Sequence, residues 1–528
     1  MMVTYINTGT IGELKEAGSA FPCGCFRRAT EVDQKDLALC SAATLRRQLS
    51  GFRVTASRFF PDFSLDRTLT EVTHCQVVKD RAVRQVFYLQ APCGEFFLKR
   101  STLVRTKDRL RHLFLPRRRW AEWRNLHRLR AARIAAPDPV LKGEKGGIHL
   151  EGFFLLTRKV NGAPLSYDSL TGAKKLGQYI AFLHARGVYH ADLHPENIII
   201  KNNGQPSLLD VQQVFFLPWL PRWLRLYNLG KLYFHLRSKP HPEGWVAALL
   251  GGYNEAGERP LTISELVRAA GRYQQRHYRS RAKRCCKNST EFVVVKGNDF
   301  QGYKRRDFRW GPQELHQALE KGETIKEGRV IAFQGVCIKT HHKQFFHQDR
   351  CLASWKMSRA LEVRDISVPR SLGYFIMDGD SFFLSEFLVD SMLLNDYLSS
   401  LTDEREKRRA LKKLAVWFKK IHDHDIWQRD FKSSNILCQD GDYLMVDLDG
   451  VKVCRQLPDE KKILNLAQLN ASLSNAITIK DRLRFYYYYM AGKRPSRQQR
   501  RAIYRKVWAI TTTKNTSSFG LDIAKLKL

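Results

Sequence analysis

Apolar residues recur at intervals of three and four in two segments, one in each half of the chain. They are Leu176, Ile180 and Leu183 in the first half, and Leu411, Leu414, Phe418 and Ile421 in the second. This spacing collects apolar side chains on one face, so both segments are predicted to be amphipathic helices. Two short apolar runs, EFFLK up to Lys99 and GVCIK up to Lys339, predict strands that end at a lysine.

A second pair of helices is predicted after the two lysines. The segments are RRRWAEWRNLHRLRAARIAAP, closed by Pro137, and CLASWKMSRALEVRDISVP, closed by Pro369. Proline ends a helix because it lacks the backbone N–H and its ring clashes with the preceding turn. Glu122 precedes Pro137 by the same interval as Ser354 precedes Pro369, so the two helices align with each other.

Four motifs repeat in the same order in the two halves. HARGVYHADLHPENIII (184–200) recurs in outline as HDHDIWQRDFKSSNILC (422–438). At offsets of 237 to 240 residues, Lys99, Asp192, Asn197 and Asp210 recur as Lys339, Asp430, Asn435 and Asp447. A nearly constant offset over four motifs indicates two copies of one fold. We expect residues 1–65 to be an N-terminal segment of unknown role, followed by domains at 66–285 and 286–528.

Composition and charge narrow the class of protein. The chain has 528 residues, of which 43% are hydrophobic, enough to build more than one core and to exclude a wholly disordered basic protein. The formal net charge of +37 implies an anionic partner: nucleic acid, an acidic membrane surface or a phosphorylated substrate. The eleven cysteines are scattered without a CxxC pair, which favours reduced thiols over disulfides or zinc.

No segment of the sequence has the pattern of a secretion signal or of a membrane-spanning helix. The N-terminus lacks an apolar signal core, and no run of 18 apolar residues occurs. We therefore expect a cytoplasmic protein that can still touch a membrane surface.

The repeated residues are the types that phosphoryl transfer requires. A lysine must hold the nucleotide phosphates, a carboxylate must orient the attacking hydroxyl, and an Asn with a second Asp must hold Mg²⁺. Each residue alone has an ordinary alternative, since a single Asp often caps a turn and a single Lys often ends a strand. An ordered set that occurs twice favours the chemical interpretation.

The loop HADLHPEN, from His190 to Asn197, resembles the HxDxxxxN catalytic loop of the protein-kinase-like superfamily. Together with FFLK, the AEW helix opening and LLDVQQV, it looks like the bacterial lipopolysaccharide kinase family, which phosphorylates heptose or Kdo sugars of the inner core. The resemblance spans roughly residues 75–240 and, more weakly, 290–480. It implies an α+β fold of two tandem protein-kinase-like bilobal domains, each with a β-rich N-lobe and a helical C-lobe, that use ATP and Mg²⁺.

The resemblance also implies a role for each repeated residue. Asp192 and Asp430 would be catalytic, Lys99, Glu122 and Lys339 would bind ATP, and Asn197, Asp210, Asn435 and Asp447 would bind the metal. Two departures from the family pattern stand out. The glycine-rich loop is absent, since VVKDRAVRQVFYLQ contains no glycine. In the second copy Ser354 aligns with Glu122, although Glu362 lies 23 residues after Lys339, as Glu122 does after Lys99.

The segment after each metal-binding Asp bears on the acceptor. Protein kinases carry a long activation segment ending in APE at this point, and it presents the peptide. Here the helical sequences PRWLRLYNLGKLYFHL and DEKKILNLAQLN follow closely, and APE is absent. We expect a phosphotransferase that acts on an inner-core lipopolysaccharide sugar, or a related phosphorylated glycan, at the cytoplasmic membrane face. The alternatives are a kinase-like scaffold or regulator with an inactive second copy, and a protein Ser/Thr kinase.

Three basic stretches could account for the charge. Thirteen Lys and Arg residues lie between Lys99 and Arg133, densest at 117–119, and form either a solvated helix face or a surface for phosphorylated headgroups. Residues 215–237 combine Trp219 and Trp223 with Arg222, Arg225 and Lys231, as in a membrane-interface segment or a buried helix. Residues 485–506 mix aromatic and basic residues, but no nucleic-acid-binding fingerprint occurs, so nucleic acid is not the expected partner.

Overall fold

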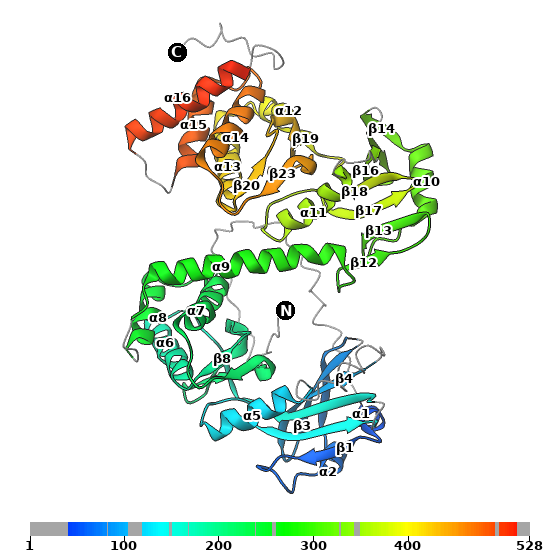
Figure 1. The fold of residues 1–528 in the computed structure, drawn as a ribbon, viewed down its shortest axis with the longest axis vertical. Coiled ribbons are helices and arrows are strands. Elements are labelled where there is room, and N and C mark those ends of the chain that lie inside the picture. The colour runs from blue at the N-terminus through cyan, green and yellow to red at the C-terminus, as the bar shows by residue number, and fades with distance from the viewer. Residues whose placement is uncertain are drawn as a thin grey trace. The chain divides into compact units, whose positions relative to one another are not determined.

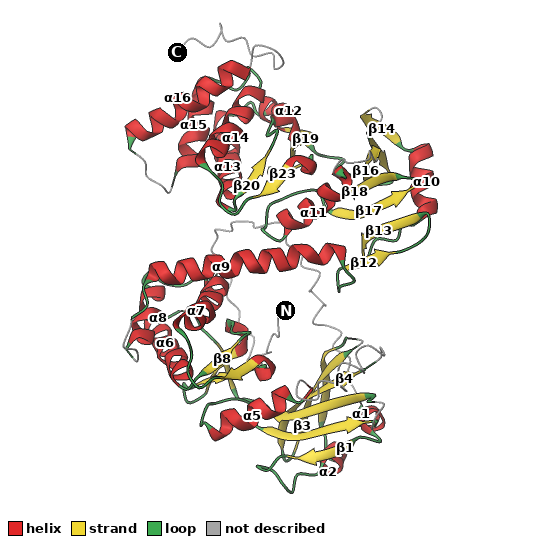
Figure 2. Ribbon diagram, in the orientation of Figure 1, coloured by secondary structure: helices red, strands yellow, loops and turns green. Residues whose placement is uncertain are grey.

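The computed structural model describes residues 41–514, apart from 82, 104–118, 147–149, 167, 238, 256–259, 327–328, 343–348 and 492–495. The chain divides into two compact units, Met1–Gln274 and Gln275–Leu528. Each unit has a sheet-rich lobe followed by a lobe made mainly of helices (Figures 1 and 2). This confirms the predicted α+β class with two kinase-like bilobal domains.

The N-lobe of the first unit is built on an antiparallel sheet of six described strands, in the order β1-β5-β6-β4-β3-β2. The strands are β1 (Arg53–Ala56), β2 (His74–Lys79), β3 (Arg84–Ala91), β4 (Gly94–Thr102), β5 (Pro139–Lys145) and β6 (Gly152–Arg158). Helices α1 (Ala42–Leu49) and α2 (Leu65–Thr70) pack on the sheet through Leu45, Leu49 and Leu69. Part of the segment before residue 66, to which the sequence assigns no role, therefore completes this lobe.

Lys99 and Lys339, the predicted phosphate-binding lysines, lie inside their strands, which corrects the prediction that each strand ends at its lysine. β4 continues beyond Lys99 and pairs with β6 as far as Thr102. In the second unit β16 (Val336–His342) continues beyond Lys339 and pairs with β18 as far as His342. The polar residues after each lysine can extend the strand because backbone hydrogen bonds, and not only apolar side chains, hold a strand in a sheet.

Helices and short strand pairs make up the rest of the first unit. The helices are α5 (Ala121–Ala131), α6 (Leu170–Ala185), α7 (Arg222–Leu236), α8 (Trp245–Asn254) and the first part of α9 (Ile263–Ala282), which continues past Gln274 into the second unit. The short elements are β7 (Gly162–Pro164), β8 (Val188–His190), η1 (Pro195–Asn197), β9 (Ile198–Lys201), β10 (Pro206–Leu208), η2 (Val211–Gln213) and β11 (Val214–Phe216). The predicted helical face of α6 is buried, and a Cβ on Gly177 would lie 2.0 Å from Leu249 O of α8, so glycine permits this close packing.

The second unit repeats the arrangement with a sheet of seven described strands, in the order β12-β13-β17-β18-β16-β15-β14. Its strands are β12 (Phe292–Val295), β13 (Phe300–Arg305), β14 (Glu323–Lys326), β15 (Val330–Phe333), β16, β17 (Ser371–Met377), β18 (Asp380–Glu386), β19 (Met392–Leu393), β20 (Ile426–Gln428), β21 (Ile436–Gln439), β22 (Asp442–Met445) and β23 (Val451–Val453). Its α-helices are α10 (Pro312–Lys321), α11 (Arg350–Glu362), α12 (Leu394–Ser400), α13 (Glu404–Asp423), α14 (Asp459–Ser472), α15 (Ile479–Met490) and α16 (Arg497–Lys514). The 3₁₀ turns are η3 (Lys283–Cys286), η4 (Ser433–Asn435) and η5 (Leu448–Gly450).

The two units match residue by residue where α5 and α11 end. Ile134 N donates to Leu129 O at 2.9 Å, and Ile366 N donates to Leu361 O at 3.1 Å. In both units the residue just before this isoleucine has a left-handed backbone conformation: Arg133 (φ 55°) in the first unit and Asp365 (φ 59°) in the second. The equal spacing supports the alignment that the prolines indicate, in which Ser354 takes the place of Glu122.

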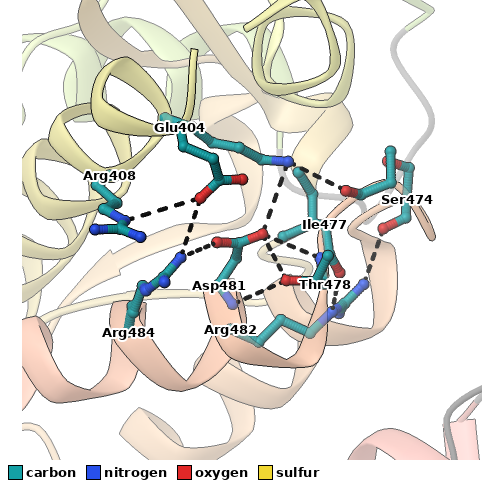
Figure 3. A network of polar contacts seen from close by, with 10 residues as sticks. Glu404, Arg408, Ser474, Ile477, Thr478, Asp481, Arg482 and Arg484 are labelled. Atoms are coloured by element: carbon teal, nitrogen blue, oxygen red, sulfur yellow. Dashed lines mark hydrogen bonds and ion pairs between the residues drawn. The ribbon is translucent and has the colours of Figure 1, made fainter. Parts of the chain in front are cut away.

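A buried arginine fixes the end of α14 in the second unit (Figure 3). Arg482 is 1% exposed, and its Nε donates to Ile477 O at 2.9 Å. Its Nη1 donates to Asn470 Oδ1 at 3.0 Å, and its Nη2 donates to Leu473 O at 3.1 Å and Ser474 O at 3.0 Å. The last carbonyls of a helix have no partner within the helix, and here one guanidinium supplies donors at that end.

The described part of the chain contains no helix long and apolar enough to cross a membrane. The cysteines within it are free thiols.

Candidate active site

In the first unit, Lys99 of β4 lies between two carboxylates. Its Nζ donates a hydrogen bond to Glu122 Oε1 of α5 and lies 3.9 Å from Asp210 Oδ1. Arg84 Nη2 of β3 lies 3.8 Å from the second oxygen of Glu122. The structure thus brings together three residues that the sequence predicts for one site, and Glu122 holds the ammonium group in place. A recess beside this pair is lined by Trp120 and other side chains of α5 and β6.

A basic hairpin between β2 and β3 occupies the position where the glycine-rich loop is missing. Arg81 and Arg84 close the turn with reciprocal backbone hydrogen bonds of 3.2 and 3.0 Å. Burial lowers the pKa of Lys79, and the nearby charges of Arg81, Arg84 and Lys99 lower it further, while Asp210 acts in the opposite direction. These cations therefore lie close enough to one another to form one positive cluster, although the sequence analysis did not assign a role to Lys79 or Arg81.

Asp192 in the catalytic loop is paired with Lys231 of α7. Lys231 Nζ lies 2.5 Å from Asp192 Oδ1 and donates to Ala191 O at 2.9 Å. Burial works against the ionised carboxylate, but the hydrogen bond and charge of Lys231 outweigh it and lower the pKa of Asp192. His194 Nε2 is 3.8 Å from the other oxygen of Asp192. At neutral pH the carboxylate is therefore ionised and able to accept a hydrogen bond from a hydroxyl group.

His190 connects the start of this loop to the residue before Asp210. Its Nδ1 accepts a hydrogen bond from Asp192 N at 3.1 Å, so the ring proton is on Nε2, which donates to Leu209 O at 3.2 Å. Burial lowers the pKa of His190, which keeps the ring neutral. The imidazole therefore acts as a fixed spacer between the two aspartate-bearing loops.

Asn197 and Asp210 provide oxygen atoms suited to a hard cation. Asn197 Nδ2 donates to Asp192 O at 2.9 Å, which leaves Oδ1 as the atom for a cation. The backbone oxygen of Asn197 accepts from Leu209 N at 2.8 Å, which fixes the loop next to Asp210. The Asp210 side chain is 46% exposed on a left-handed residue (φ 45°). An amide oxygen and a carboxylate are ligands that Mg²⁺ accepts in kinases, so these residues fit the ion.

A buried chain of hydrogen bonds supports the loop from behind. Asn228 Nδ2 of α7 donates to His190 O at 2.7 Å, and Asn228 Oδ1 lies 3.0 Å from His184 Nε2 of α6. His184 Nδ1 in turn lies 2.9 Å from Tyr253 OH of α8. Burial lowers the pKa of His184 to about 4, so the ring is neutral near pH 7. Three helices thereby fix the position of the loop.

In the second unit, Lys339 pairs with Asp447, and α11 supplies no carboxylate to it. Lys339 Nζ donates to Asp447 Oδ1 and lies 3.8 Å from Asp449 Oδ1. Ser354 of α11 is buried at the position that aligns with Glu122. Glu362 pairs instead with Arg305 at 2.6 Å and with a neighbouring arginine of α11, so it does not serve Lys339, in agreement with the proline alignment.

The catalytic loop of the second unit keeps its geometry with different side chains. Asn435 Nδ2 donates to Asp430 O at 2.8 Å, as in the first unit. Gln428 replaces His190, and its Nε2 donates to Asp447 O at 2.9 Å. The cation beside Asp430 is Lys432 of the same loop, with Nζ 2.8 Å from Asp430 Oδ2.

Gln468 of α14 lies where Lys231 lies in the first unit. Its Nε2 donates to Arg429 O at 2.7 Å, the counterpart of the bond from Lys231 to Ala191 O. One turn earlier, Asn465 repeats the role of Asn228. Neither Lys231 nor Gln468 was predicted from the sequence to be a site residue, although the repeat offset of 237 residues relates them to each other.

For residues 215–237 the sequence leaves open a membrane-interface segment or a buried helix, and in the structure Leu226, Leu229 and Leu232 of α7 are part of the core. Lys231 is buried against Asp192, Arg222 pairs with Glu265 at 2.9 Å, and Arg225 Nε donates to Leu220 O at 2.7 Å. These charges are used within the fold. The exposed side chains of the segment are aromatic, namely Phe215, Trp219 and Trp223.

Only part of each of the other two basic stretches lies among the residues that the structure describes. Arg117 and Arg118 lie outside the described residues, while Arg119 Nη2 lies 3.4 Å from Glu144 Oε2. In the stretch 485–506, Phe485 and Tyr486 are buried in the core of the second unit, where they cannot stack on nucleic-acid bases.

A family model matches two segments of the chain, one in each unit. Residues 85–253 and 336–489 match the family described as the lipopolysaccharide kinase (Kdo/WaaP) family. No curated protein matches the chain.

Three solved structures resemble parts of the chain. "WaaP in complex with acyl carrier protein" shares 16% identity over 43% of this chain and 97% of that chain, with a TM-score of 0.31. An aminoglycoside-3'-phosphotransferase of type VIII shares 17% identity over 43% of this chain and 95% of that chain, with a TM-score of 0.29. The bifunctional kinase-methyltransferase WbdD shares 16% identity over 35% of this chain and 47% of that chain, with a TM-score of 0.22.

Proposed function

The chain belongs to the lipopolysaccharide kinase (Kdo/WaaP) family and is a kinase, and from this premise we propose that it transfers phosphate from ATP to a sugar hydroxyl of the lipopolysaccharide inner core, on heptose or Kdo. The observation that carries the proposal is the pairing of Asp192 with Lys231 in the same unit as the Lys99–Glu122 pair. Together they supply an ionised base and a fixed phosphate-binding cation in one unit.

The N-lobe residues would hold the nucleotide. Lys99, oriented by Glu122, would bind the phosphates, and the positive hairpin of Lys79, Arg81 and Arg84 would cover them in place of a glycine-rich loop. When bound through Asn197 and Asp210, Mg²⁺ would neutralise charge that develops on the phosphates.

Asp192 would orient the acceptor hydroxyl and accept its proton. As the sugar oxygen forms its bond to the γ-phosphorus, the bond from that phosphorus to the bridging oxygen of ADP breaks, and the hydroxyl proton passes to Asp192. Lys231 keeps this carboxylate ionised beforehand and holds it toward the site.

The short segment after each metal-binding Asp supports a non-peptide acceptor. Helix α7 begins at Arg222, soon after Asp210, and α14 begins at Asp459, soon after Asp447. This length leaves little room for the peptide platform that protein kinases build there.

Peripheral attachment at the cytoplasmic membrane face is part of the proposal. The net charge of +37 favours an anionic surface, and Phe215, Trp219 and Trp223 are exposed aromatic side chains of the kind that enter a bilayer interface.

The test is ATP consumption by the purified full chain with and without deacylated inner-core oligosaccharide. Wild type would be compared with Asp192→Asn, Asp430→Asn and the double variant. We expect stimulation by the oligosaccharide and its loss in Asp192→Asn. Loss in both single variants would indicate two working sites. Absence of stimulation in wild type would reject the sugar acceptor, and phosphorylation of generic basic proteins in its place would favour the protein kinase alternative.

A further inference from the structure

The two units place the carboxylate beside the phosphate-binding lysine on different elements. In the first unit it is Glu122 of α5, which bonds Lys99 and lies 3.8 Å from Arg84. In both units the lysine also lies near the predicted metal ligand, Asp210 or Asp447, and Lys339 donates its hydrogen bond to Asp447. The additional carboxylate in the second unit is Asp449 of η5, with Oδ1 3.8 Å from Lys339 Nζ. Asp449 Oδ2 also lies 3.8 Å from Arg350 Nε of α11. Each lysine thus shares its carboxylate with an arginine.

The exchange is reciprocal along the sequence. At the helix position the first unit has Glu122 and the second has the neutral Ser354. At the other position the second unit has Asp449 and the first has the neutral Gln212. Gln212 and Asp449 are 237 residues apart, the same offset that separates Asp210 from Asp447. Gln212 lines the recess beside Lys99, so this position faces the lysine in both units.

The Asp449 side chain is placed to act on Lys339. It is only 9% exposed, so its charge is poorly screened by water. η5 packs against α11, the helix that carries Ser354 and Arg350. Since an ionised carboxylate in such a position needs cations to offset its desolvation, Lys339 and Arg350 stabilise Asp449 as much as Asp449 orients them.

We propose that Asp449 is the residue that positions Lys339 for nucleotide phosphates, so that the second unit is a nucleotide site with a relocated carboxylate and not an inactive copy. Because the proposed effect of Asp449 is exerted through Lys339, 3.8 Å away, Asp449 would be a positioning residue. The inference rests on the proposed use of ATP but concerns nucleotide binding alone, independently of the acceptor.

The test measures binding of a fluorescent ATP analogue with Mg²⁺ to the full chain that carries Lys99→Met, which leaves the second site to report. In this background Asp449→Asn is expected to weaken binding about tenfold, corresponding to about 1.4 kcal/mol. Asp442→Asn, an exposed carboxylate of β22, is the matched control and is expected to bind normally.

Two further variants separate positioning from loss of folding. Asp449→Asn should have no further effect when Lys339→Met is already present, because Asp449 acts through that lysine. The double variant Ser354→Glu, Asp449→Gln, which copies the first unit, should restore binding. Unchanged binding in Asp449→Asn, an additive loss with Lys339→Met, or no Mg²⁺-dependent binding in the Lys99→Met parent would overturn the inference. Failure of oligosaccharide stimulation would reject the proposed acceptor and leave this result standing.

Discussion

Lys231 of α7 donates a hydrogen bond to Asp192, with 2.5 Å between Lys231 Nζ and Asp192 Oδ1. Helix α7 follows the predicted catalytic loop in sequence. We expect Lys231→Gln to keep the loop in place, because Gln468 bonds the equivalent carbonyl in the second unit. The loss of the cation should raise the pKa of Asp192, so the acid limb of the pH profile of kcat/KM should move to higher pH and kcat should fall about tenfold.

A rescue and a control accompany this prediction. Adding His194→Lys to Lys231→Gln copies Lys432 of the second unit and should move the acid limb back. Lys174→Gln removes an exposed partner of Glu255 and should leave the profile unchanged. An unaltered profile in Lys231→Gln would show that Lys231 does not set the charge of Asp192.

The positive hairpin should contribute to the KM for ATP more than to kcat. Substituting Lys79→Met together with Arg81→Met removes two cations proposed to face the phosphates, so KM for ATP should rise about tenfold while kcat changes little. The difference should shrink as salt is added, because added ions screen the lost charges. Lys239→Met, an exposed lysine after α7, serves as control. A fall in kcat with constant KM would contradict this role.

The buried His184 should make the first unit less stable in acid. Its folded-state pKa of about 4 lies below the ordinary value of 6.5, so the unfolded chain binds a proton that the folded chain does not. Stability is full above pH 6.5 and falls as the pH drops toward 4, by up to about 1.4 kcal/mol per pH unit. Calorimetric melting of wild type and His184→Gln at pH 7 and pH 5 should show a smaller drop in the variant. Parallel drops would exclude His184 as the source.

Arg482→Met should destabilise the second unit by about 3 kcal/mol or more. The substitution removes the donor to Asn470 O near the end of α14 and to the carbonyl oxygens of Leu473 and Ser474 just after it. Figure 3 shows the contact with Ser474. Arg484→Met removes a partly exposed partner of Asp481 and should cost far less. Urea unfolding followed by tryptophan fluorescence compares the two variants, and equal midpoints would refute the structural role of Arg482.

The exposed tryptophans should govern membrane attachment. Trp219→Ser with Trp223→Ser is expected to reduce co-sedimentation with vesicles containing anionic phospholipid about tenfold, without changing turnover of a soluble oligosaccharide. Tyr487→Ser removes an exposed aromatic side chain of the second unit and is the control. Equal sedimentation of all three proteins would place the attachment elsewhere or reject it.

The sequence predicted the fold because the motifs occur twice in the same order. It also predicted that Lys99 and Glu122 would meet and that Ser354, not Glu362, would take the aligned position, since proline ends both helices at the same distance. It did not predict Lys231, because a lysine in a helix rich in tryptophan and leucine has the same local pattern at a membrane interface as in a core. Only the packing of α7 against the loop distinguishes the two.

For a similar reason, the residues that take the place of the missing glycine-rich loop could not be identified from the sequence. Lys79 and Arg81 belong to a chain with 89 Lys and Arg residues, and nothing in their local sequence sets them apart. Their significance comes from the short turn between β2 and β3, which places Lys79 where the charges of Arg81, Lys99 and Asp210 act on it.

The different positions of Glu122 in the first unit and Asp449 in the second would allow inhibitors that select between the two units. In the first unit, a nucleotide-competitive compound that extends past Lys99 would meet the carboxylate of Glu122 on α5. In the second unit, the same compound would meet the hydroxyl of Ser354 on α11 and the carboxylate of Asp449 on η5. A compound with an amine directed at Glu122 should therefore occupy one site and spare the other. Together with a second compound directed at Asp449, it would allow the two proposed nucleotide sites to be blocked separately in living cells without altering the gene.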